Sequence, residues 1–308
     1  MHLHNRHKRL SDPTIFIVNY FTTVRRDVIK TFHTLFDDPK LSQLNWVVIE
    51  TTGLADPAPL IQSLYMDEKC KKHLRMDSIL TVVDAKHIEL HLHSSSEKKG
   101  IHGKTLEAVQ QLCFADRVIL NKMDLVSEEE VQKVVKVIQA TNPNASIIKC
   151  KYSSVPVEKL LNIRAFDATR NSVLIENTVR ENSVPVFLKT DANGKILRKT
   201  VNNYAIAGTR VSTVSLTTTK AIDMDKFNFW IVKLLQENGM SVYRLKGILN
   251  MHGYEEQFVA QGVHMVFDGH RGQPWKKSER TSRLVFIGED LDKKKLEMEF
   301  LSCCADRQ

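Results

Sequence analysis

The sequence predicts an α/β protein, in which helices cover both faces of a parallel sheet, followed by a smaller α+β domain. Two observations carry the first part of this prediction. Strands that alternate with helices form parallel sheets, and helical or irregular stretches separate the apolar runs of the first half. Each run has the length of a buried strand; the four are residues 46–49, 78–83, 117–120 and 146–150.

A helix is predicted between the last two runs. Ser127 is a favourable N-cap residue, and Glu130 three positions later completes a capping box. Apolar side chains then recur at helical spacing until the Asn-Pro-Asn sequence at residues 142–144 ends the helix. The acidic residues 128–130 suit the positive end of a helix, so we interpret them as a solvated helix start and not as an active site.

A different pattern begins near residue 209. Residues 211–216 alternate as a strand does, and residues 225–237 form an amphipathic helix that ends at an Asn-Gly pair. The same part of the chain carries three further strand patterns and a last helix that Asp290 would cap; these are residues 242–249, 258–265 and 283–287, and about residues 291–302. The predicted organisation is a first domain, a linker and a second domain, over residues 1–165, 166–208 and 209–304.

Bulk properties favour an intracellular globular protein. Of the 308 residues, 42% are hydrophobic and 26% are charged, as is ordinary for one large or two modest domains. No apolar run approaches the ~20 residues that span a bilayer, and the run at residues 14–18 has only strand length. We therefore expect a cytoplasmic protein, with an organelle left open. The five scattered cysteines argue against a disulfide framework, and the adjacent Cys303 and Cys304 are expected to be reduced thiols.

The formal charge of +8 leaves nucleic acid open as a partner. The basic residues are spread along the chain, however, and no arginine-aromatic stripe or zinc-finger pattern accompanies them. We expect no specific nucleic-acid partner and no membrane partner.

The first motif that carries chemistry is Asn-Lys-x-Asp, formed by Asn121, Lys122 and Asp124 directly after the strand at residues 117–120. The Asp124 carboxylate can accept two hydrogen bonds from the ring N–H and the exocyclic amine of guanine, a pair that adenine does not offer. The Lys122 stem can pack over the base, and Asn121 can brace the loop. Ligands of parallel sheets bind at this end of the strands, so the motif predicts a guanine site. The alternative is an ordinary strand-to-helix loop.

The second motif follows the strand at residues 46–49. A carboxylate at a strand end, here Glu50, is a typical holder of Mg²⁺ near a triphosphate. Gly53 would let a backbone N–H approach the γ-phosphate, and Thr51 and Thr52 lie between the two residues. The alternative is a strand end followed by a turn.

Six blocks of the chain resemble the CobW family, which belongs to the GTPase class of the nickel chaperones HypB and UreG. The blocks are residues 48–59, 80–85, 114–124, 243–247, 261–269 and 283–288. The resemblance implies a GTP-binding domain that couples hydrolysis to metal delivery, with Mg²⁺ and GTP as ligands and a client metalloprotein bound through the C-terminal domain. The eukaryotic branch of the family is associated with zinc transfer. Glu50 would then serve Mg²⁺, residues 51–53 the γ-phosphate, and the Asn-Lys-x-Asp residues the base; Asp84 matches a block without a certain role.

One departure from the family concerns phosphate. Family members begin with a strand and a loop of the form Gly-x-x-x-x-Gly-Lys-Thr, which cradles phosphates, and no such loop precedes Glu50 here. The Gly-Lys-Thr at residues 103–105 lies after Glu50 and follows no strand, so we interpret it as a mobile basic loop. The expected sheet is therefore an incomplete P-loop-type sheet without its first strand. Either a misjudged gene start or a splice variant would explain that.

The other departure concerns metal. The family usually carries Cys-x-Cys-Cys before a Thr-Val-Arg sequence, whereas the three slots here hold Asn19, Phe21 and Thr22, none of them a good zinc ligand. The histidines His87, His91 and His93 are weak substitute candidates, and a solvated loop is the preferred interpretation of that segment.

Two functional hypotheses follow. The first is the family function, a GTP-dependent zinc metallochaperone. The second is a truncated or diverged interaction protein that retains the partner-binding C-terminal domain without hydrolysis. Whether the chain is an enzyme stays open, and weak or absent GTP hydrolysis is expected because the phosphate loop would hold most of the triphosphate charge.

Overall fold

The computed structural model describes most of the chain, namely residues 15–20, 25–38, 44–53, 55–88, 107–165, 189–190, 196–197, 210–275 and 280–305. The chain forms two compact units, Met1–Arg75 and Met76–Gln308. The candidate linker and the Gly-Lys-Thr loop lie almost wholly outside the described residues. Among the described residues, no helix has the length and apolarity needed to cross a bilayer.

Two parallel strands and three helices make up the described part of the first unit: β1 (Ile15–Tyr20), α1 (Arg25–Asp37), β2 (Trp46–Thr51), α2 (Ala58–Met66) and α3 (Glu68–His73). Val28, Phe32 and Leu35 recur four and three residues apart on α1, which places them on one face of the helix. They form a small core with Leu60 of α2 and Cys70 of α3. This packing stabilises α1, a helix that was not predicted from the sequence.

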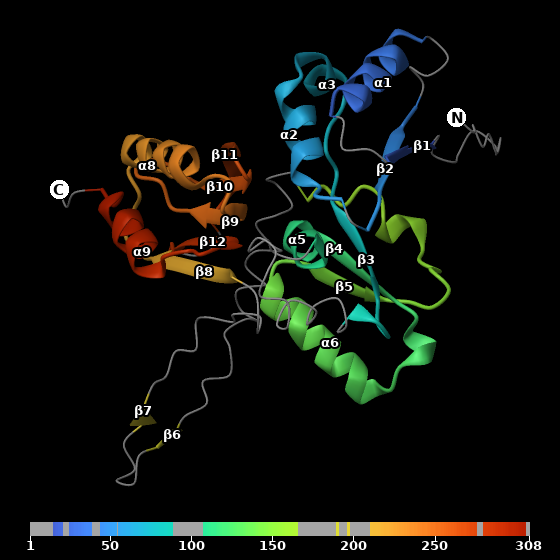
Figure 1. Cartoon of the computed structure of the whole chain (residues 1–308). Helices are drawn as coiled ribbons and strands as arrows, with labels where there is room; N and C mark the ends of the chain where they lie inside the picture. Colours follow the sequence, from blue (N-terminus) through green and yellow to red (C-terminus); the bar gives the residue numbers. More distant parts are fainter. Residues whose placement is uncertain are drawn as a thin grey trace, which may run out of the picture. The chain divides into compact units, whose positions relative to one another are not determined.

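The second unit begins with the parallel strands β3 (Leu80–Asp84), β4 (Arg117–Asn121) and β5 (Ser146–Lys149), which pair in that order (Figure 1). Two helices, α5 (Glu107–Phe114) and α6 (Glu128–Thr141), accompany them. The predicted capping box of Ser127 and Glu130 is confirmed, and α6 ends at Asn142 as expected. The buried Asn142 side chain donates to the carbonyls of Leu112 and Ala115 at 2.8 Å, which ties the end of α6 to the end of α5.

The rest of the second unit contains a five-stranded antiparallel sheet in the order β11-β10-β9-β12-β8. Its elements are β8 (Val211–Thr218), α8 (Met224–Asn238), β9 (Val242–Leu249), β10 (Glu256–Val263), β11 (Val266–Pro274), β12 (Ser282–Glu289) and α9 (Lys293–Ser302). Phe227 and Trp230 of α8 and Phe300 of α9 pack in one core with apolar residues of the sheet. A separate pair of two-residue strands, β6 (Lys189–Thr190) and β7 (Ile196–Leu197), completes the described elements.

These elements confirm the α/β class and the separate C-terminal α+β domain, with two corrections. The cap of α9 is Asp292, whose side chain accepts a hydrogen bond from the Lys295 backbone, and not Asp290. Asp290 has a left-handed φ of 52° and binds the Arg210 guanidinium instead. Strand β11 was not predicted because its sequence does not alternate, which an edge strand of a sheet tolerates.

A buried ion cluster joins the antiparallel sheet to the start of β4. The Arg244 guanidinium of β9 donates to the carboxylate of Asp116 and to the carbonyl of Phe114. Lys246, two residues further along the same strand, donates to Asp116 Oδ1 at 2.9 Å and to the Ala165 carbonyl at 3.1 Å. The side chains of Asp116 and Arg244 are 2% and 1% exposed, so the ion pair is almost completely shielded from solvent.

Burial and the two cations act oppositely on Asp116. Burial would raise the pKa of this carboxyl, but Arg244 and Lys246 outweigh it and hold the pKa below its ordinary value. Burial and the neighbouring Arg244 lower the pKa of Lys246 to about 8, against the attraction of Asp116. Because one carboxylate faces two cations, Arg244 and Asp116 form the essential pair and Lys246 is the surplus charge.

We expect Arg244→Met to lower the free energy of unfolding by about 3–5 kcal/mol, because it leaves a buried carboxylate without its principal partner. Urea denaturation followed by far-ultraviolet circular dichroism measures the change. Arg210→Met is the matched control, since Arg210 binds Asp290 at the surface with 61% of its side chain exposed; it should cost no more than ~1 kcal/mol. Equal losses in the two variants would contradict a structural role of the cluster.

Candidate functional site

The Asn-Lys-x-Asp residues form the loop that follows β4. Lys122 adopts a left-handed conformation with φ 62° and ψ 37°, which is uncommon for a residue other than glycine. The chain then makes one 3-10 turn, η1 (Met123–Leu125), closed by a hydrogen bond from the Leu125 N–H to the Lys122 carbonyl at 3.0 Å. The sharp turn leaves Asp124 exposed. Its carboxylate is therefore accessible to a ligand at the carboxyl end of the strand.

Asn121 connects this loop to both neighbouring loops. Its main-chain carbonyl accepts from the Ala85 N–H, after β3, at 3.0 Å. Its side-chain Oδ1 accepts from the Ser153 N–H, after β5, at 3.0 Å, and its Nδ2 donates to Ser153 Oγ at 2.9 Å. The Cys150 thiol also donates to Oδ1, at 3.5 Å. Asn121 thus fixes the positions of three loops at one edge of the sheet.

Lys122 is held by Asp84, the last residue of β3. Lys122 Nζ lies 2.7 Å from Asp84 Oδ2, and His87 Nδ1 lies 2.9 Å from the same oxygen. The other oxygen accepts the backbone N–H of Lys86 at 2.9 Å. Partial burial acts to raise the pKa of Asp84, but these partners, Lys122 foremost, lower it below its ordinary value. The carboxylate is therefore charged at neutral pH and pins the Lys122 side chain.

The sequence analysis missed Ser153 and Cys150 and assigned no role to Asp84. That these residues lie near Asn121 could, however, have been predicted from the sequence. The carboxyl ends of parallel strands meet at one edge of the sheet, so loops that begin after residues 83, 120 and 149 had to lie together. What the sequence did not show is which of the loop residues make the contacts.

The Glu50 motif lies in the first unit, at the carboxyl end of β2. Glu50 pairs in register with Asn19 of β1, and its side chain is exposed. Thr51 and Thr52 are half-buried, and a side chain added at Gly53 would meet no atom within 4 Å. The open space at Gly53 lets a ligand approach the backbone there. Asp56 Oδ1 then accepts the Ala58 N–H at 2.9 Å, at the start of α2.

The remaining candidates are only partly described. Of the three cysteine slots, Asn19 lies in β1, and Phe21 and Thr22 lie outside the described residues. Of the candidate histidines, His87 binds Asp84, while His91 and His93 also lie outside them. The predicted reduced cysteines are confirmed: all five are free thiols, and Cys303 is the C-cap of α9.

The fold is of the α/β class, and the loops described above meet at the carboxyl edge of a parallel sheet, where sheets of this kind bind ligands. Comparison with known families is more specific. Residues 21–149 match the CobW/HypB/UreG nucleotide-binding domain, and residues 211–304 match the cobalamin synthesis protein cobW C-terminal domain. Together the two matches cover more than two thirds of the chain, and the chain belongs to the CobW family.

Individual relatives agree with this assignment. The chain is 27% identical to the "Zinc-regulated GTPase metalloprotein activator 1" of Saccharomyces cerevisiae, over 83% of the chain and 61% of that protein. It is 25% identical to the "Zinc chaperone YjiA" of Escherichia coli, over 84% and 70%. The crystal structure of the Zn(II)-bound YjiA GTPase shares the fold, with a TM-score of 0.69 and 21% identity over 92% of this chain and 78% of that one. The chain spans about 60% of the length of the yeast relative.

Replacing Asp84 should weaken guanine binding without unfolding the loop. We expect Asp84→Asn to release the Lys122 ammonium, which costs up to about 1 kcal/mol for a partly exposed pair, or about a fivefold weaker affinity. An NMR titration with GDP measures this even when binding is weak. Lys149→Gln is the matched control, because Lys149 pairs with Glu128 at the surface of the same sheet. An unchanged affinity in Asp84→Asn would show that the Lys122 position does not matter.

Proposed function

We propose that the protein is a GTP-dependent zinc metallochaperone of the CobW family, which couples GTP binding and hydrolysis to metal transfer. The loop after β4 carries this proposal. It combines a braced Asn121, a Lys122 pinned by Asp84 and an exposed Asp124, at the edge where parallel sheets bind ligands. The relatives, a zinc-regulated GTPase metalloprotein activator and a zinc chaperone, support the same function.

Base selection would come from Asp124. A carboxylate has only acceptor oxygens, and guanine presents two adjacent donors, the ring N–H and the exocyclic amine. Adenine has an acceptor in place of that ring N–H. The Lys122 stem would lie along the base plane while its ammonium stays on Asp84, 2.7 Å away. Asn121 would mainly brace the loop in this arrangement, because its amide oxygen and one amide hydrogen bind Ser153.

The strand end at Glu50 would serve the phosphates. A carboxylate and neighbouring hydroxyls are the oxygen ligands that Mg²⁺ prefers, and Glu50, Thr51 and Thr52 supply them. When bound, Mg²⁺ would neutralise charge on the β- and γ-phosphates. The exposed Gly53 would let its backbone N–H reach a phosphate oxygen. Zinc in this proposal is cargo, and the C-terminal α+β domain would contact the client metalloprotein.

The direct test is binding of a fluorescent GTP analogue to the 308-residue polypeptide, with the matching ATP analogue as control and with Mg²⁺ and zinc varied. Guanine-selective binding that strengthens with Mg²⁺ is the expected result for the chaperone. A polypeptide that discriminates neither base would contradict the proposal for these residues.

A second function is favoured by two features of the sequence. No Gly-x-x-x-x-Gly-Lys-Thr loop precedes Glu50 in the 308 residues, and the cysteine slots hold no thiol. A polypeptide of these residues would then act as a non-hydrolysing interaction protein through its C-terminal domain. Guanine-selective binding without GTP turnover supports this function, and turnover at the rate of a family GTPase excludes it.

Replacing one carboxylate oxygen of Asp124 by an amide nitrogen should shift the base preference from guanine to xanthine. Asp124→Asn replaces an acceptor oxygen by a donor amide, which matches xanthine, where a carbonyl stands in place of the guanine amine. We expect the variant to lose at least tenfold in affinity for the guanine nucleotide and to gain affinity for the xanthine nucleotide, since each pair of matched hydrogen bonds contributes about 1–3 kcal/mol. Asp56→Asn is the matched control. Equal losses for both nucleotides would mean that Asp124 does not read the base.

A further inference from the structure

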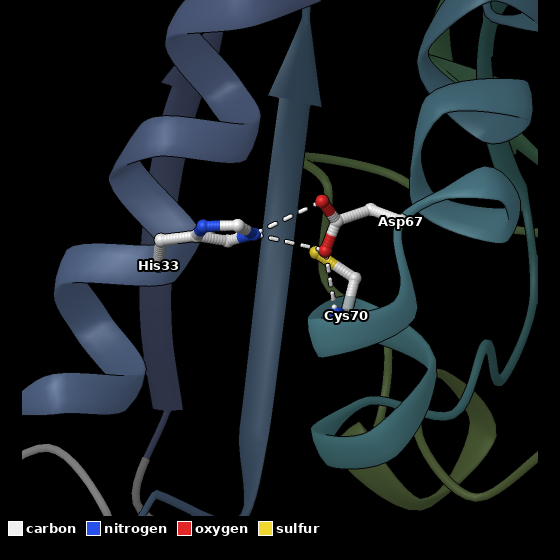
Figure 2. Close-up of side chains that lie close together, drawn as sticks. All are labelled: His33, Asp67 and Cys70. Carbon is white, nitrogen blue, oxygen red and sulfur yellow. Dashed lines mark hydrogen bonds and ion pairs between the residues drawn. The ribbon is translucent and has the colours of Figure 1, made fainter.

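Three potential metal ligands of different chemistry meet in the first unit, about 50 residues or more before the Asn-Lys-x-Asp motif in sequence. They are His33 of α1, Asp67 at the junction of α2 and α3, and Cys70 of α3 (Figure 2). One ligand atom from each lies within 4.8 Å of the other two. His33 Nε2 is 2.9 Å and 3.0 Å from the two Asp67 oxygens, although 34 residues separate them in the chain. Among the described residues, this is the one group of three or more such side chains.

We propose that His33, Asp67 and Cys70 form a zinc site with one open coordination position. An imidazole nitrogen, a thiolate and a carboxylate oxygen are the three ligand types that zinc takes in proteins. A thiolate and a carboxylate together neutralise the dication, so the occupied site carries no net charge. Three protein ligands with a fourth position left for water or for an incoming ligand are typical of zinc sites that exchange or react.

The spacing of His33 and Asp67 is close to what tetrahedral zinc needs, and the Cys70 sulfur lies within 4.8 Å of both ligand atoms. At zinc–ligand distances of about 2.0–2.1 Å, an imidazole nitrogen and a carboxylate oxygen lie ~3.3 Å apart. The His33–Asp67 contact would therefore open by only a few tenths of an ångström. Asp67 Oδ1 already accepts the Cys70 N–H at 2.8 Å. That hydrogen bond can persist while Oδ2 binds the metal, so the N-cap of α3 also orients the ligand.

The three residues differ in burial: Cys70 lies deepest, and His33 and Asp67 lie nearer the surface. Cys70 is 1% exposed and belongs to the small core around Phe32 and Leu60. The side chains of His33 and Asp67 are 40% and 21% exposed. A cation can thus enter past the imidazole and the carboxylate and meet the thiol at the bottom. His33 and Asp67, which are half-buried, are also the two side chains that must move.

Binding requires the thiol to lose its proton. Burial, and then the Asp67 carboxylate, raise the pKa of Cys70 to about 12, so the free protein carries a thiol. The sulfur–hydrogen bond is exchanged for a sulfur–zinc bond, and one proton leaves to solvent for each ion bound. His33 coordinates as a neutral imidazole through Nε2, with its ring proton on Nδ1. The other charged groups near the site are Lys69 and Asp37, which bind each other at 2.6 Å, and His73.

The inference does not depend on GTP, and its test therefore uses the 308-residue polypeptide without nucleotide. Co²⁺ is the first probe, because tetrahedral cobalt has strong visible bands and a thiolate ligand adds a charge-transfer band in the near ultraviolet. We expect the charge-transfer band to saturate at one Co²⁺ per chain. Zn²⁺ should then bleach it by displacing Co²⁺, without further proton release. Zn²⁺ added to the metal-free polypeptide should instead release one proton per ion in weakly buffered solution.

Variants assign the ligands. Cys70→Ser should abolish the charge-transfer band, and His33→Gln and Asp67→Asn should each weaken Co²⁺ binding by roughly tenfold or more, the loss that even an indirect partner of a ligand causes. Cys304→Ser and His73→Gln are matched controls that keep the band, because Cys304 lies at the C-terminal end of the described chain and His73 lies outside the triad. His33 is half-buried and is not part of the small core, so its variant answers the question even where Cys70→Ser unfolds. Circular dichroism verifies the fold.

Two results would overturn the proposal. One is the absence of a charge-transfer band in the folded wild-type chain, which would leave His33 and Asp67 as an ion pair over a core thiol. The other is a band that survives Cys70→Ser or is unchanged in His33→Gln. Neither result bears on guanine binding, and a failure to bind the fluorescent GTP analogue would leave the cobalt titration unaffected.

Discussion

The buried pairing of Asp116 with Arg244 is the contact on which the second unit depends. It joins the residue just before β4 to the middle of β9, so it attaches the antiparallel sheet to the parallel one. Lys246 and the Phe114 carbonyl complete the polar contacts on the same side. An ion pair at this depth has a large desolvation cost, and it favours one arrangement because no misplaced partner could satisfy Asp116. The C-terminal domain is therefore fixed to the sheet that carries the guanine motif.

Strand β4 connects this contact to the site. Asp116 precedes its first residue, and Asn121 is its last. Val118 and Leu120 between them are fully buried, so the strand is a rigid element with the domain contact at one end and the candidate base-binding loop at the other. A displacement of the antiparallel sheet that disturbed Asp116 would act on the same strand that positions Lys122 and Asp124. This provides a physical route from the antiparallel sheet to the loop after β4.

Periodicity and capping residues made much of the fold predictable, and contacts across the chain did not. The strand at residues 242–249 and the capping box at Ser127 were predicted correctly because each is a local pattern. Asp290 and Asp292 are equally good caps in sequence, and only the tertiary contact with Arg210 decides between them. At the candidate site, the prediction of a guanine motif rested on four consecutive residues. Its supports, Asp84 and Ser153, lie 38 and 31 residues from Lys122 and were not.

The cysteines are a second case in which contacts between distant residues could not be predicted from the sequence. In the sequence, the odd and scattered cysteines argued against a disulfide framework, and nothing distinguished Cys70 from Cys113. In the structure, Cys113 is fully buried and belongs to no group of three potential metal ligands among the described residues, which leaves it a core side chain. Cys70 is equally buried, but α1 brings a histidine and the cap of α3 brings a carboxylate to within ligand distance of it. Burial alone makes a thiol inert, because it raises the pKa. Where a carboxylate and an imidazole lie beside the buried thiol, a cation can bind all three groups and replace the thiol proton. This difference between Cys70 and Cys113 depends on packing between helices, which no sequence motif records.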